Sequence, residues 1–550
     1  MHVIYIYGGT SNKKIAIRDG DTASSYNLHL GSIVNSSINN INDSVLLNNI
    51  AQKNIKSYSE YVYSQNKNFI AQGLILDKKL SLYFLSDFSC KRSEFFSTYS
   101  DYCSAILIKA FILDNNIDRI VVDNTSFEFY TMIESISTGV QCQSIGLAVE
   151  KYKLFKLGAK HVVFFGKTLI SVFFRGLFDN SKPFKSVKKI DKLFLTRYPL
   201  HLNHKMKEDK YSELAEGKDF LVNIITDGFH QNVGIFNFMK YINSLSTRDD
   251  IYILDRYLKI SDVMKSFISI FSISKKFRKL LKKEYMLNDI DMSAHIKNEL
   301  KFSMARIPRL LMWKKPLSRF IKAHRISSFY YYLHEYTYGR MFTYTFKIES
   351  PDTHLIGFQH GPASSRKLLY MTANNELLNC KDAINSFPVP NTVLAEDRHS
   401  ANIYKSSGYN NVQVMKKIYR LSYLKNINRN NTVPNLFLIA PGLHDGEFLM
   451  KSLVDLILNN KQCQFILKTH PRANNAYINK FKNIRNLDIS YDHISKLLSR
   501  TSKVIATYSS VAIEAKILGI DVELIEVPGR VNESPLIDSD FLACLQNIKY

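Results

Sequence analysis

Short apolar runs alternate with longer segments of helical spacing over most of the chain. The apolar runs are bounded by glycine, proline or polar residues, a pattern typical of buried strands. The pattern predicts strands at Val3–Tyr7, Leu82–Leu85, Arg119–Val122, Phe220–Ile225, Arg325–Leu333, His354–Phe358, Thr392–Ala395, Val412–Met415, Asn435–Ala440, Phe465–Leu467, Val504–Ala506 and Val522–Val527. Helices such as Ala105–Leu113 and Glu447–Leu458 are predicted between them, and residues 20–60 are predicted as loops with short helices. This alternation predicts an α/β fold with doubly wound parallel sheets.

Two predicted strands in the C-terminal half end in polar side chains. Phe465–Leu467 is followed by a cation-rich stretch, Lys468–Arg472, and Val504–Ala506 is followed by Ser509 and Ser510 at the start of a predicted helix. Ligands of open α/β sheets bind at the carboxyl ends of strands, and helix N-termini favour phosphates. We therefore predict that both strand ends face one crevice, which binds the phosphate of a nucleotide.

Further residues belong to the same predicted pocket by their positions. Glu514 lies about one helical turn after Ser510, where it can accept hydrogen bonds from sugar hydroxyls, and Gly442 lets the backbone approach a ligand. Asp445 is interpreted as a helix cap. The predicted binding set is Gly442, Lys468, His470, Pro471, Arg472, Ser509, Ser510 and Glu514.

The asparagine-rich segment Leu424–Val433, followed by Pro434, predicts an interdomain linker. Residues 1–432 then form an N-terminal α/β domain with a helical, basic insertion at about 160–325. Residues 433–550 form a C-terminal Rossmann-like domain.

The segment Lys160–Phe178 is strongly apolar, but Lys167 and Arg175 interrupt it and it is short for a membrane span. Lysines at 182, 185, 188, 189 and 192 follow it, and residues 255–325 are also very basic. An apolar face beside a basic cluster is typical of a helix that lies on an anionic membrane. The alternative is a core helix followed by a solvated basic loop, and both interpretations stay open.

The net charge of +24 and the pI of about 9.5 indicate a polyanionic partner, which leaves nucleic acid, anionic lipid and phosphorylated metabolites. No RNA-binding strand with interleaved aromatics, zinc finger or basic heptad is recognisable, so nucleic acid is not expected. The six cysteines show no CxxC spacing, which predicts neither a zinc site nor a disulfide framework and suits a reducing cytosol. The segment after Met1 lacks the basic and long apolar regions of a signal peptide, so a cytoplasmic location is expected.

Three residues at predicted strand ends are candidates for a general base. Asp227 follows Phe220–Ile225, Glu335 follows Arg325–Leu333, and His360 follows His354–Phe358. If the last two strands are parallel neighbours, Glu335 and His360 should lie close together, and the carboxylate can then orient the histidine. Each also has a plainer interpretation: a turn residue for Asp227, a helix-terminal charge for Glu335 and a loop histidine for His360.

Three stretches occur in the order found in bacterial surface-carbohydrate enzymes: GFQHG at Gly357–Gly361, ILKTHPR at Ile466–Arg472, and TYSSVAIEAKILG at Thr507–Gly519. The chain thereby resembles GT-B-type glycosyltransferases of capsule and O-antigen synthesis. The His-Pro pair followed by a Ser-Ser pair is similar to the pattern of sialyl-, polysialyl- and Kdo-type transferases, in which these residues hold the phosphate of a CMP-sugar. It is also similar to the pattern of CDP-glycerol glycerophosphotransferases. The resemblance covers roughly residues 330–530, and the acidic base motif of the sialyltransferases has only Thr226-Asp227-Gly228 as a counterpart.

The resemblance implies a GT-B-like fold of two Rossmann-like domains facing a cleft, with an acceptor-side N-terminal domain. It implies a metal-independent glycosyltransferase that moves a sugar from a nucleotide donor, with a CMP-linked acidic sugar favoured, to a lipid-linked or growing surface polysaccharide. No cofactor and no metal ion are expected, and the basic face would hold the enzyme peripherally on the inner face of the bacterial cytoplasmic membrane. The alternatives are a CDP-glycerol-type polyol phosphotransferase and a non-catalytic, membrane-docked assembly protein.

Overall fold

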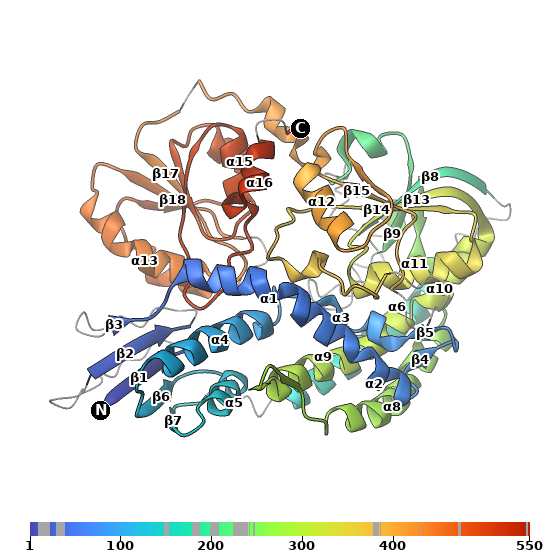
Figure 1. Ribbon diagram of the computed structural model, residues 1–550. Helices are drawn as coiled ribbons and strands as arrows, with labels where there is room; N and C mark the ends of the chain where they lie inside the picture. Colours follow the sequence, from blue (N-terminus) through green and yellow to red (C-terminus); the bar gives the residue numbers. More distant parts are fainter. Residues whose placement is uncertain are drawn as a thin grey trace.

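The structure is a computed structural model. It describes the chain outside residues 9–21, 29–38, 148–152, 179–187, 198–207, 209, 224–239, 241, 246–247, 378–383, 385–386, 431, 471–472, 474 and 546–547, and within helix α6 it describes the side chains of residues 159–175. Figure 1 shows the C-terminal residues in dark orange and red as one lobe, the strands of the middle sheet in green to light orange as a second, and the blue N-terminal strands as a third; the green helix α9 (Ser293–Leu311) packs against helices of this third lobe. Each lobe contains a parallel sheet.

The C-terminal sheet has five parallel strands in the order β19-β18-β17-β20-β21. Its strands are β17 (Leu436–Ala440), β18 (Gln464–Leu467), β19 (Leu487–Ile489), β20 (Lys503–Ala506) and β21 (Asp521–Leu524). The associated helices are α13 (Gly446–Asn459), α14 (Ile494–Leu498), α15 (Val511–Ile517) and α16 (Ser539–Leu545). The chain begins in the middle strand, extends the sheet to one side and then crosses to the other, so the strand order reverses between β17 and β20. This reversal is the position at which doubly wound sheets bind ligands.

Alternate residues of these strands are buried on opposite faces of the sheet. Leu438 and Val504 belong to one apolar cluster, whereas Ile439 and Ile505 belong to another. The continuous apolar runs read from the sequence arise because both faces of a parallel sheet are covered.

The middle lobe has seven parallel strands in the order β10-β9-β8-β13-β14-β15-β16, which again reverses beside the first strand. The strands are β8 (Lys188–Arg197), β9 (Asp219–Asn223), β10 (Ile251–Ile253), β13 (His324–Tyr332), β14 (His354–Phe358), β15 (Thr392–Ala395) and β16 (Val412–Val414). The helices between them are α8 (Ile260–Leu280), α9 (Ser293–Leu311), α10 (Lys314–Ala323), α11 (Thr337–Glu349) and α12 (Arg398–Ser406).

The N-terminal lobe has a third parallel sheet in the order β3-β2-β1-β6-β7. Its strands are β1 (His2–Tyr7), β2 (Thr22–Asn27), β3 (Asn39–Asn40), β6 (Arg119–Asp123) and β7 (Gln141–Ile145). Its helices include α1 (Ser44–Ser64), α3 (Asp87–Cys90), α4 (Thr98–Asp114) and α5 (Phe127–Ile136), and α6 (Lys153–Phe178) follows. The predicted α/β class with Rossmann-like sheets is confirmed, and this lobe adds a third sheet to the predicted pair.

Three local predictions are wrong. Residues 20–60 contain two short strands and most of the long helix α1, whose N-terminus is capped by Asp43 through a 2.8 Å bond from the Leu46 backbone N–H. Leu82–Leu85 is a 3-10 helix that is buried on every side, so its apolar run does not indicate a strand. The stretch after α6 is not a solvated basic loop from Lys188 onwards, because it forms β8 with Ile190 and Leu193–Leu195 buried in the sheet.

The predicted insertion at about 160–325 supplies helices α8, α9 and α10, and it also supplies three strands of the seven-stranded sheet. The predicted linker begins inside a 3-10 helix, Tyr419–Asn426, whose Leu421 and Leu424 are buried in the C-terminal apolar cluster. The division of the chain at residue 433 stays a prediction. Among the described residues, no helix is long and apolar enough to cross a membrane.

Candidate functional site

The register of the C-terminal sheet aligns the loops that follow its three middle strands. Ile439 pairs with Leu467 of β18, and Ala440 pairs with Ala506 of β20. The loops after β18 and β20 therefore flank the loop after β17, and adjacent strands are roughly 5 Å apart. Gly442 marks their meeting point, because its backbone N–H donates to Thr507 Oγ1 at 3.0 Å.

The predicted phosphate-binding residues differ in exposure. Lys468, His470 and Ser509 are half-buried, and Ser510 is exposed. Lys468 forms no ion pair among the described residues, which leaves its ammonium available to an anion. Pro471 and Arg472 lie outside the described residues. Whether this set binds a nucleotide stays a prediction.

The helix after the Ser-Ser pair is shorter than the pattern suggests. α15 has seven residues, and Ser510 precedes it without a side-chain capping bond. Ser509 Oγ accepts a 3.4 Å bond from the Val511 backbone N–H. Hydroxyls and backbone N–H groups, rather than a long helix dipole, are therefore what this segment offers an anion.

Glu514 is already engaged by its neighbours. Its carboxylate accepts a 2.7 Å bond from the Tyr423 hydroxyl and lies 4.0 Å from Arg420. Burial raises the pKa of this carboxyl group. Arg420 also makes two bonds to Glu396, at 2.6 and 2.9 Å, so Glu514 belongs to a polar cluster between the C-terminal and middle lobes.

Asp445 differs from its interpretation as a helix cap. It stands at the N-cap position of α13, but its side chain makes no capping bond. The residue is 3% exposed, and neither carboxylate oxygen has a hydrogen-bond partner in the described structure. A Cβ at Gly442 would lie 2.8 Å from Asp445 Oδ1, so glycine is what allows the carboxylate to approach the loop backbone. The sequence contained one signal for a binding role of Asp445: an acidic residue in the first loop of a Rossmann-like unit. This loop lies at the switch point, the position where the strand order of the sheet reverses.

The three candidates for the general base differ in burial and in their contacts. β13 and β14 are parallel neighbours, as the argument for Glu335 and His360 requires. Glu335 is 3% exposed, accepts a hydrogen bond from the Tyr404 hydroxyl and lies 3.3 Å from His334 Nε2. His360 is half-buried, and its ring centroid lies 5.3 Å from that of Tyr332. Asp227 lies outside the described residues.

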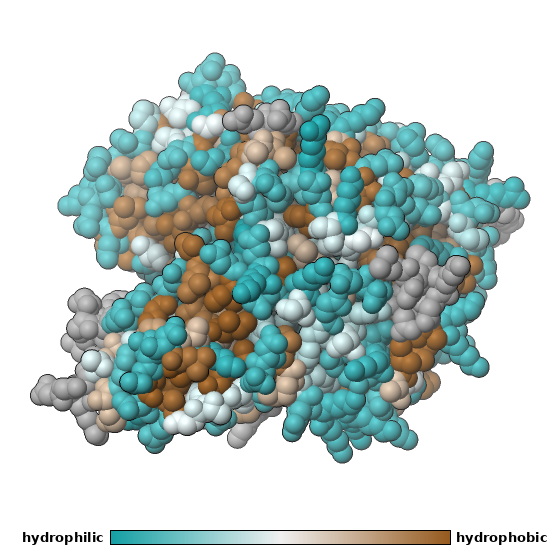
Figure 2. All heavy atoms as spheres, viewed as in Figure 1, coloured by the Kyte–Doolittle hydropathy of each residue, from teal (hydrophilic) through white to brown (hydrophobic). Residues whose placement is uncertain are grey.

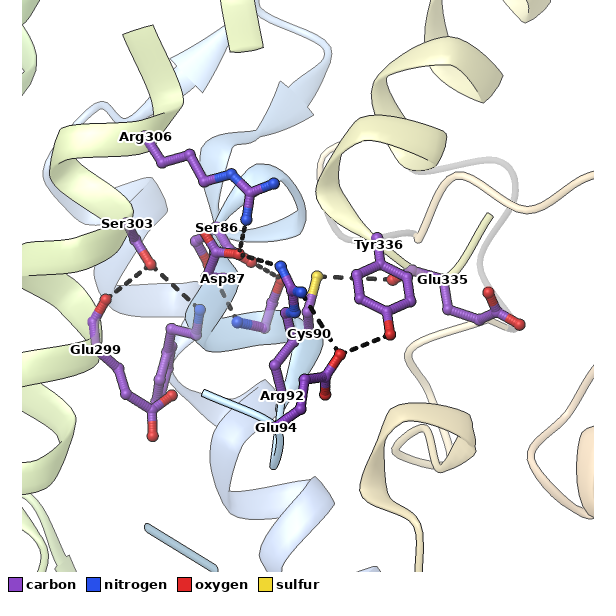
Figure 3. A network of polar contacts seen from close by, with 12 residues as sticks. Ser86, Asp87, Cys90, Arg92, Glu94, Glu299, Ser303, Arg306, Glu335 and Tyr336 are labelled. Atoms are coloured by element: carbon purple, nitrogen blue, oxygen red, sulfur yellow. Dashed lines mark hydrogen bonds and ion pairs between the residues drawn. The ribbon is translucent and has the colours of Figure 1, made fainter. Parts of the chain in front are cut away.

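A polar network connects residues of all three lobes. Figure 3 shows Arg92 between Asp87 and Glu94, with Tyr336 donating to Glu94 at 2.7 Å. The backbone oxygen of Glu94 accepts a 2.7 Å bond from His444 Nε2, in the loop after β17. The network therefore fixes the β17 loop against the N-terminal lobe.

Cavities lie between the lobes. One of about 550 Å³ is lined from the middle lobe by Glu208 and Phe220 and from the C-terminal side by Tyr423 and His493. Another of about 530 Å³ is lined by Lys416, Lys417, Lys425 and Lys549, among others. Figure 2 shows a further notch in the surface between the C-terminal and N-terminal lobes. Among the described residues, no group of three or more His, Cys, Asp or Glu side chains is arranged to hold a metal ion.

No protein-family model matches the chain, and no curated protein matches its sequence. MurG of Acinetobacter baumannii is 11% identical, with 65% of this chain and 83% of that chain covered at a TM-score of 0.32. The wall teichoic acid polymerase TagF is 12% identical, with 68% and 79% covered at 0.30. A UDP-GlcNAc 2-epimerase from Neisseria meningitidis is 11% identical, with 61% and 81% covered at 0.33. The fold class rests on the strand order and register of the three sheets.

Proposed function

We propose that the chain is a glycosyltransferase that takes a sugar from a nucleotide donor, with a CMP-linked acidic sugar favoured, and that works without a metal ion. The observation that carries the proposal is the adjacency of three loops at the switch point of the C-terminal sheet. They bring a glycine backbone, a lysine with a histidine, and a segment with two serine hydroxyls to one edge. Such an edge supplies cations and N–H or O–H donors to a phosphate.

In the proposed reaction these donors stabilise the departing nucleotide phosphate. Lys468 and His470 would neutralise charge, while Ser509 and Ser510 would donate hydrogen bonds. Loss of one preorganised donor at such a site typically lowers the rate by about 10²- to 10³-fold. Pro471 and Arg472 stay in the proposed set on the sequence pattern alone.

We propose His360 as the base that accepts the proton of the acceptor hydroxyl. It follows β14, the neighbour of β13, and it is half-buried. Glu335 is less suited, because it is buried and already accepts a hydrogen bond from Tyr404. Asp227 keeps only its support from the sequence.

The proposed acceptor is a lipid-linked or growing surface polysaccharide, met at the inner face of the cytoplasmic membrane. Helices α6 and α8 carry a surface that supports this proposal, because eight large apolar side chains on them are 40–69% exposed: Val162, Val163, Ile170, Phe173, Ile260, Met264, Ile268 and Phe271. The two helices lie together, since the rings of Phe165 and Phe267 are 5.7 Å apart. We call these eight residues the α6–α8 apolar surface.

The charges beside the α6–α8 apolar surface match an anionic bilayer. Lys160, Lys167, Lys265 and Lys275 are exposed on the same two helices. The one carboxylate among the described side chains of these helices, Asp262, is buried and bound to Arg319 at 2.5 and 2.9 Å. An exposed apolar face bordered by cations without exposed acids is what an anionic membrane attracts.

Product analysis tests the reaction type. The protein is incubated with CMP-, UDP- and GDP-sugars and with CDP-glycerol, with and without a chelator, together with a membrane extract as acceptor. The proposal expects sugar incorporation with release of the whole nucleotide phosphate and no effect of the chelator. Formation of a phosphodiester from CDP-glycerol would instead establish the phosphotransferase, and the absence of transfer from every donor would establish a non-catalytic protein.

A further inference from the structure

Four buried polar atoms without hydrogen-bond partners in the described structure lie in the loops after β17 and β18. They are both carboxylate oxygens of Asp445, the hydroxyl of Tyr477 and the side-chain oxygen of Asn475. Asp445 and Tyr477 are 3% and 7% exposed. Native proteins pair almost all buried polar atoms, so a group of unpaired ones calls for a ligand or another specific cause.

The loops that carry these atoms are in contact. A Cβ at Gly446, the residue after Asp445, would lie 2.3 Å from the Tyr477 hydroxyl, so only glycine allows this approach. Burial first, and the Asp445 and Glu447 charges next, raise the pKa of Tyr477 to about 12. Asn475 is two residues before Tyr477 in the same segment. The carboxylate and the phenol therefore share one environment, yet do not bond to each other.

The chemistry of this group is complementary to neighbouring hydroxyls. Asp445 can accept two hydrogen bonds, Asn475 Oδ1 can accept another, and Tyr477 can donate or accept. A phosphate would be repelled by the carboxylate, whereas a vicinal diol offers two donors at the spacing of two carboxylate oxygens. The Asp445 oxygens stand beside Gly442 and the Tyr477 hydroxyl beside Gly446, in the loop after β17, where the nucleotide is proposed to bind.

We propose that Asp445 and Tyr477 bind vicinal hydroxyls of the nucleotide-sugar donor, an inference that rests on the proposed function. Glu514, assigned to sugar hydroxyls from the sequence, is held by Tyr423 and Arg420 and serves the contact between lobes. Asp445 takes the hydroxyl-binding role because its carboxylate is buried at the switch point and unpaired in the described structure. The diol belongs either to the ribose or to the transferred sugar, and the two sources are separable by experiment.

The test measures nucleotide affinity by calorimetry. CMP, UMP and GMP, their 2′-deoxy counterparts and CMP-N-acetylneuraminic acid are titrated into the wild type, Asp445→Asn, Asp445→Ala and Tyr477→Phe. Asp455→Asn is the matched control, since Asp455 is an exposed carboxylate on the same helix. If the ribose is bound, the wild type should bind each deoxynucleotide about 10- to 100-fold more weakly than the corresponding ribonucleotide. Asp445→Ala should bind both forms with equal affinity.

If the transferred sugar is bound, Asp445→Ala binds CMP like the wild type but loses about 10- to 100-fold in affinity for the CMP-sugar. Equal affinities in wild type and Asp445→Ala for every ligand would overturn the inference while leaving the proposed function standing. The inference would also be overturned if Asp445→Ala lowered the rate of turnover while all affinities stayed unchanged, because Asp445 would then act as a base. Failure of every nucleotide to bind the wild type would overturn the proposed function and, with it, the inference.

A second measurement on the ligand-free protein separates this role from a structural one. An unpaired buried carboxylate costs stability in the free state, so Asp445→Asn is expected to raise the melting temperature or leave it unchanged. A clear fall in the melting temperature, with Asp455→Asn unchanged, would show that Asp445 stabilises the fold and would overturn its assignment to a ligand.

Discussion

The buried carboxylates of this protein are compensated to very different degrees. Asp87 accepts bonds from Arg92 and Arg306, at 3.4 and 2.6 Å, and Glu396 receives two bonds from Arg420. Among the described residues, Glu299 has no cation acting on its pKa and its carboxylate accepts a hydrogen bond from the Thr98 hydroxyl, while neither carboxylate oxygen of Asp445 has a hydrogen-bond partner. A charged group without compensation shifts its pKa or costs stability. Burial raises the pKa of Glu299, and the unpaired buried oxygens of Asp445 are the basis of the ligand-binding role inferred for it.

Replacing Glu299 with glutamine should stabilise the protein at high pH. Burial, opposed by the Thr98 bond and supported by the Asp87 charge, raises the pKa of Glu299 to about 8 from an ordinary value of 4.5. Between these two pH values the folded state keeps a proton that the unfolded state has released, so folding stability falls as the pH rises. Glu299→Gln removes this titration and keeps an acceptor for Thr98. Its melting temperature should match the wild type near pH 4.5 and exceed it by several degrees at pH 8.

Thr98→Val serves as the control for this titration, because it removes the hydrogen bond without removing the carboxyl group. It should make the pH dependence of the melting temperature steeper. Parallel melting curves for wild type and Glu299→Gln at every pH would contradict the raised pKa of Glu299.

At the scale of elements, the strands were predicted best where both faces are covered. β14, β15, β17, β20 and β6 were found within a residue or two, because a continuous apolar run is a strong signal in a parallel sheet. β2 was missed because its TASSYN sequence is polar, although Ser24, Ser25 and Asn27 are buried. β8 was missed because lysines interrupt its apolar pattern in the sequence, although its apolar residues are buried in the seven-stranded sheet.

The site was predictable to the level of strand ends but not to the level of contacts. The order of the motifs placed Lys468, His470 and Ser509 on neighbouring loops of one edge. The sequence could not show that Glu514 is occupied by Tyr423, because that partner lies 91 residues away in the chain. For the same reason Asp445 was interpreted locally, as a cap, when its unpaired oxygens depend on loops that fold around it.

The 3-10 helix Tyr419–Asn426 joins the middle and C-terminal lobes through charges. Arg420 lies between Glu396, which follows β15, and Glu514 in α15. Arg420→Met would leave two buried carboxylates facing each other without a cation, and breaking such a pair typically costs about 3–5 kcal/mol. Urea unfolding should therefore show a marked loss of stability for Arg420→Met.

The double variant Arg420→Met with Glu396→Gln provides the matched comparison. It removes one of the stranded charges and should recover part of the stability. Equal stability of Arg420→Met and the wild type would show that the pair contributes nothing to the contact between lobes.

At the scale of the whole molecule, three doubly wound sheets meet through their connecting loops. Glu94 of the N-terminal lobe contacts Tyr336 of the middle lobe and His444 of the C-terminal lobe. The α6–α8 apolar surface lies on other helices, away from these loops in sequence, so membrane contact and catalysis can be tested separately.

Membrane binding should depend on the α6–α8 apolar surface. Phe271→Asp places a charge at a side chain that is 69% exposed, and it should reduce co-sedimentation with phosphatidylglycerol vesicles at low salt. Leu113→Asp is the matched control, since Leu113 is 77% exposed at the end of α4. Wild-type binding should weaken at high salt and with neutral phosphatidylcholine vesicles.

Equal sedimentation of wild type and Phe271→Asp would remove this surface from membrane binding. A concentration-dependent dimer of the wild type that Phe271→Asp dissociates would instead identify the surface as a contact between copies of the chain.

The most direct test of nucleotide binding at the C-terminal strand ends is a thermal-shift comparison of the wild type with His470→Ala. CMP, CDP, UMP, UDP and GDP are each added to both proteins. The control is His354→Ala, which replaces a histidine at the start of β14 in the middle sheet. A ligand that binds only the folded state raises the melting temperature by mass action. We expect at least one nucleotide to raise the melting temperature of the wild type and of His354→Ala but not that of His470→Ala. Equal shifts in all three proteins, or no shift in any, would contradict a phosphate-binding site at His470.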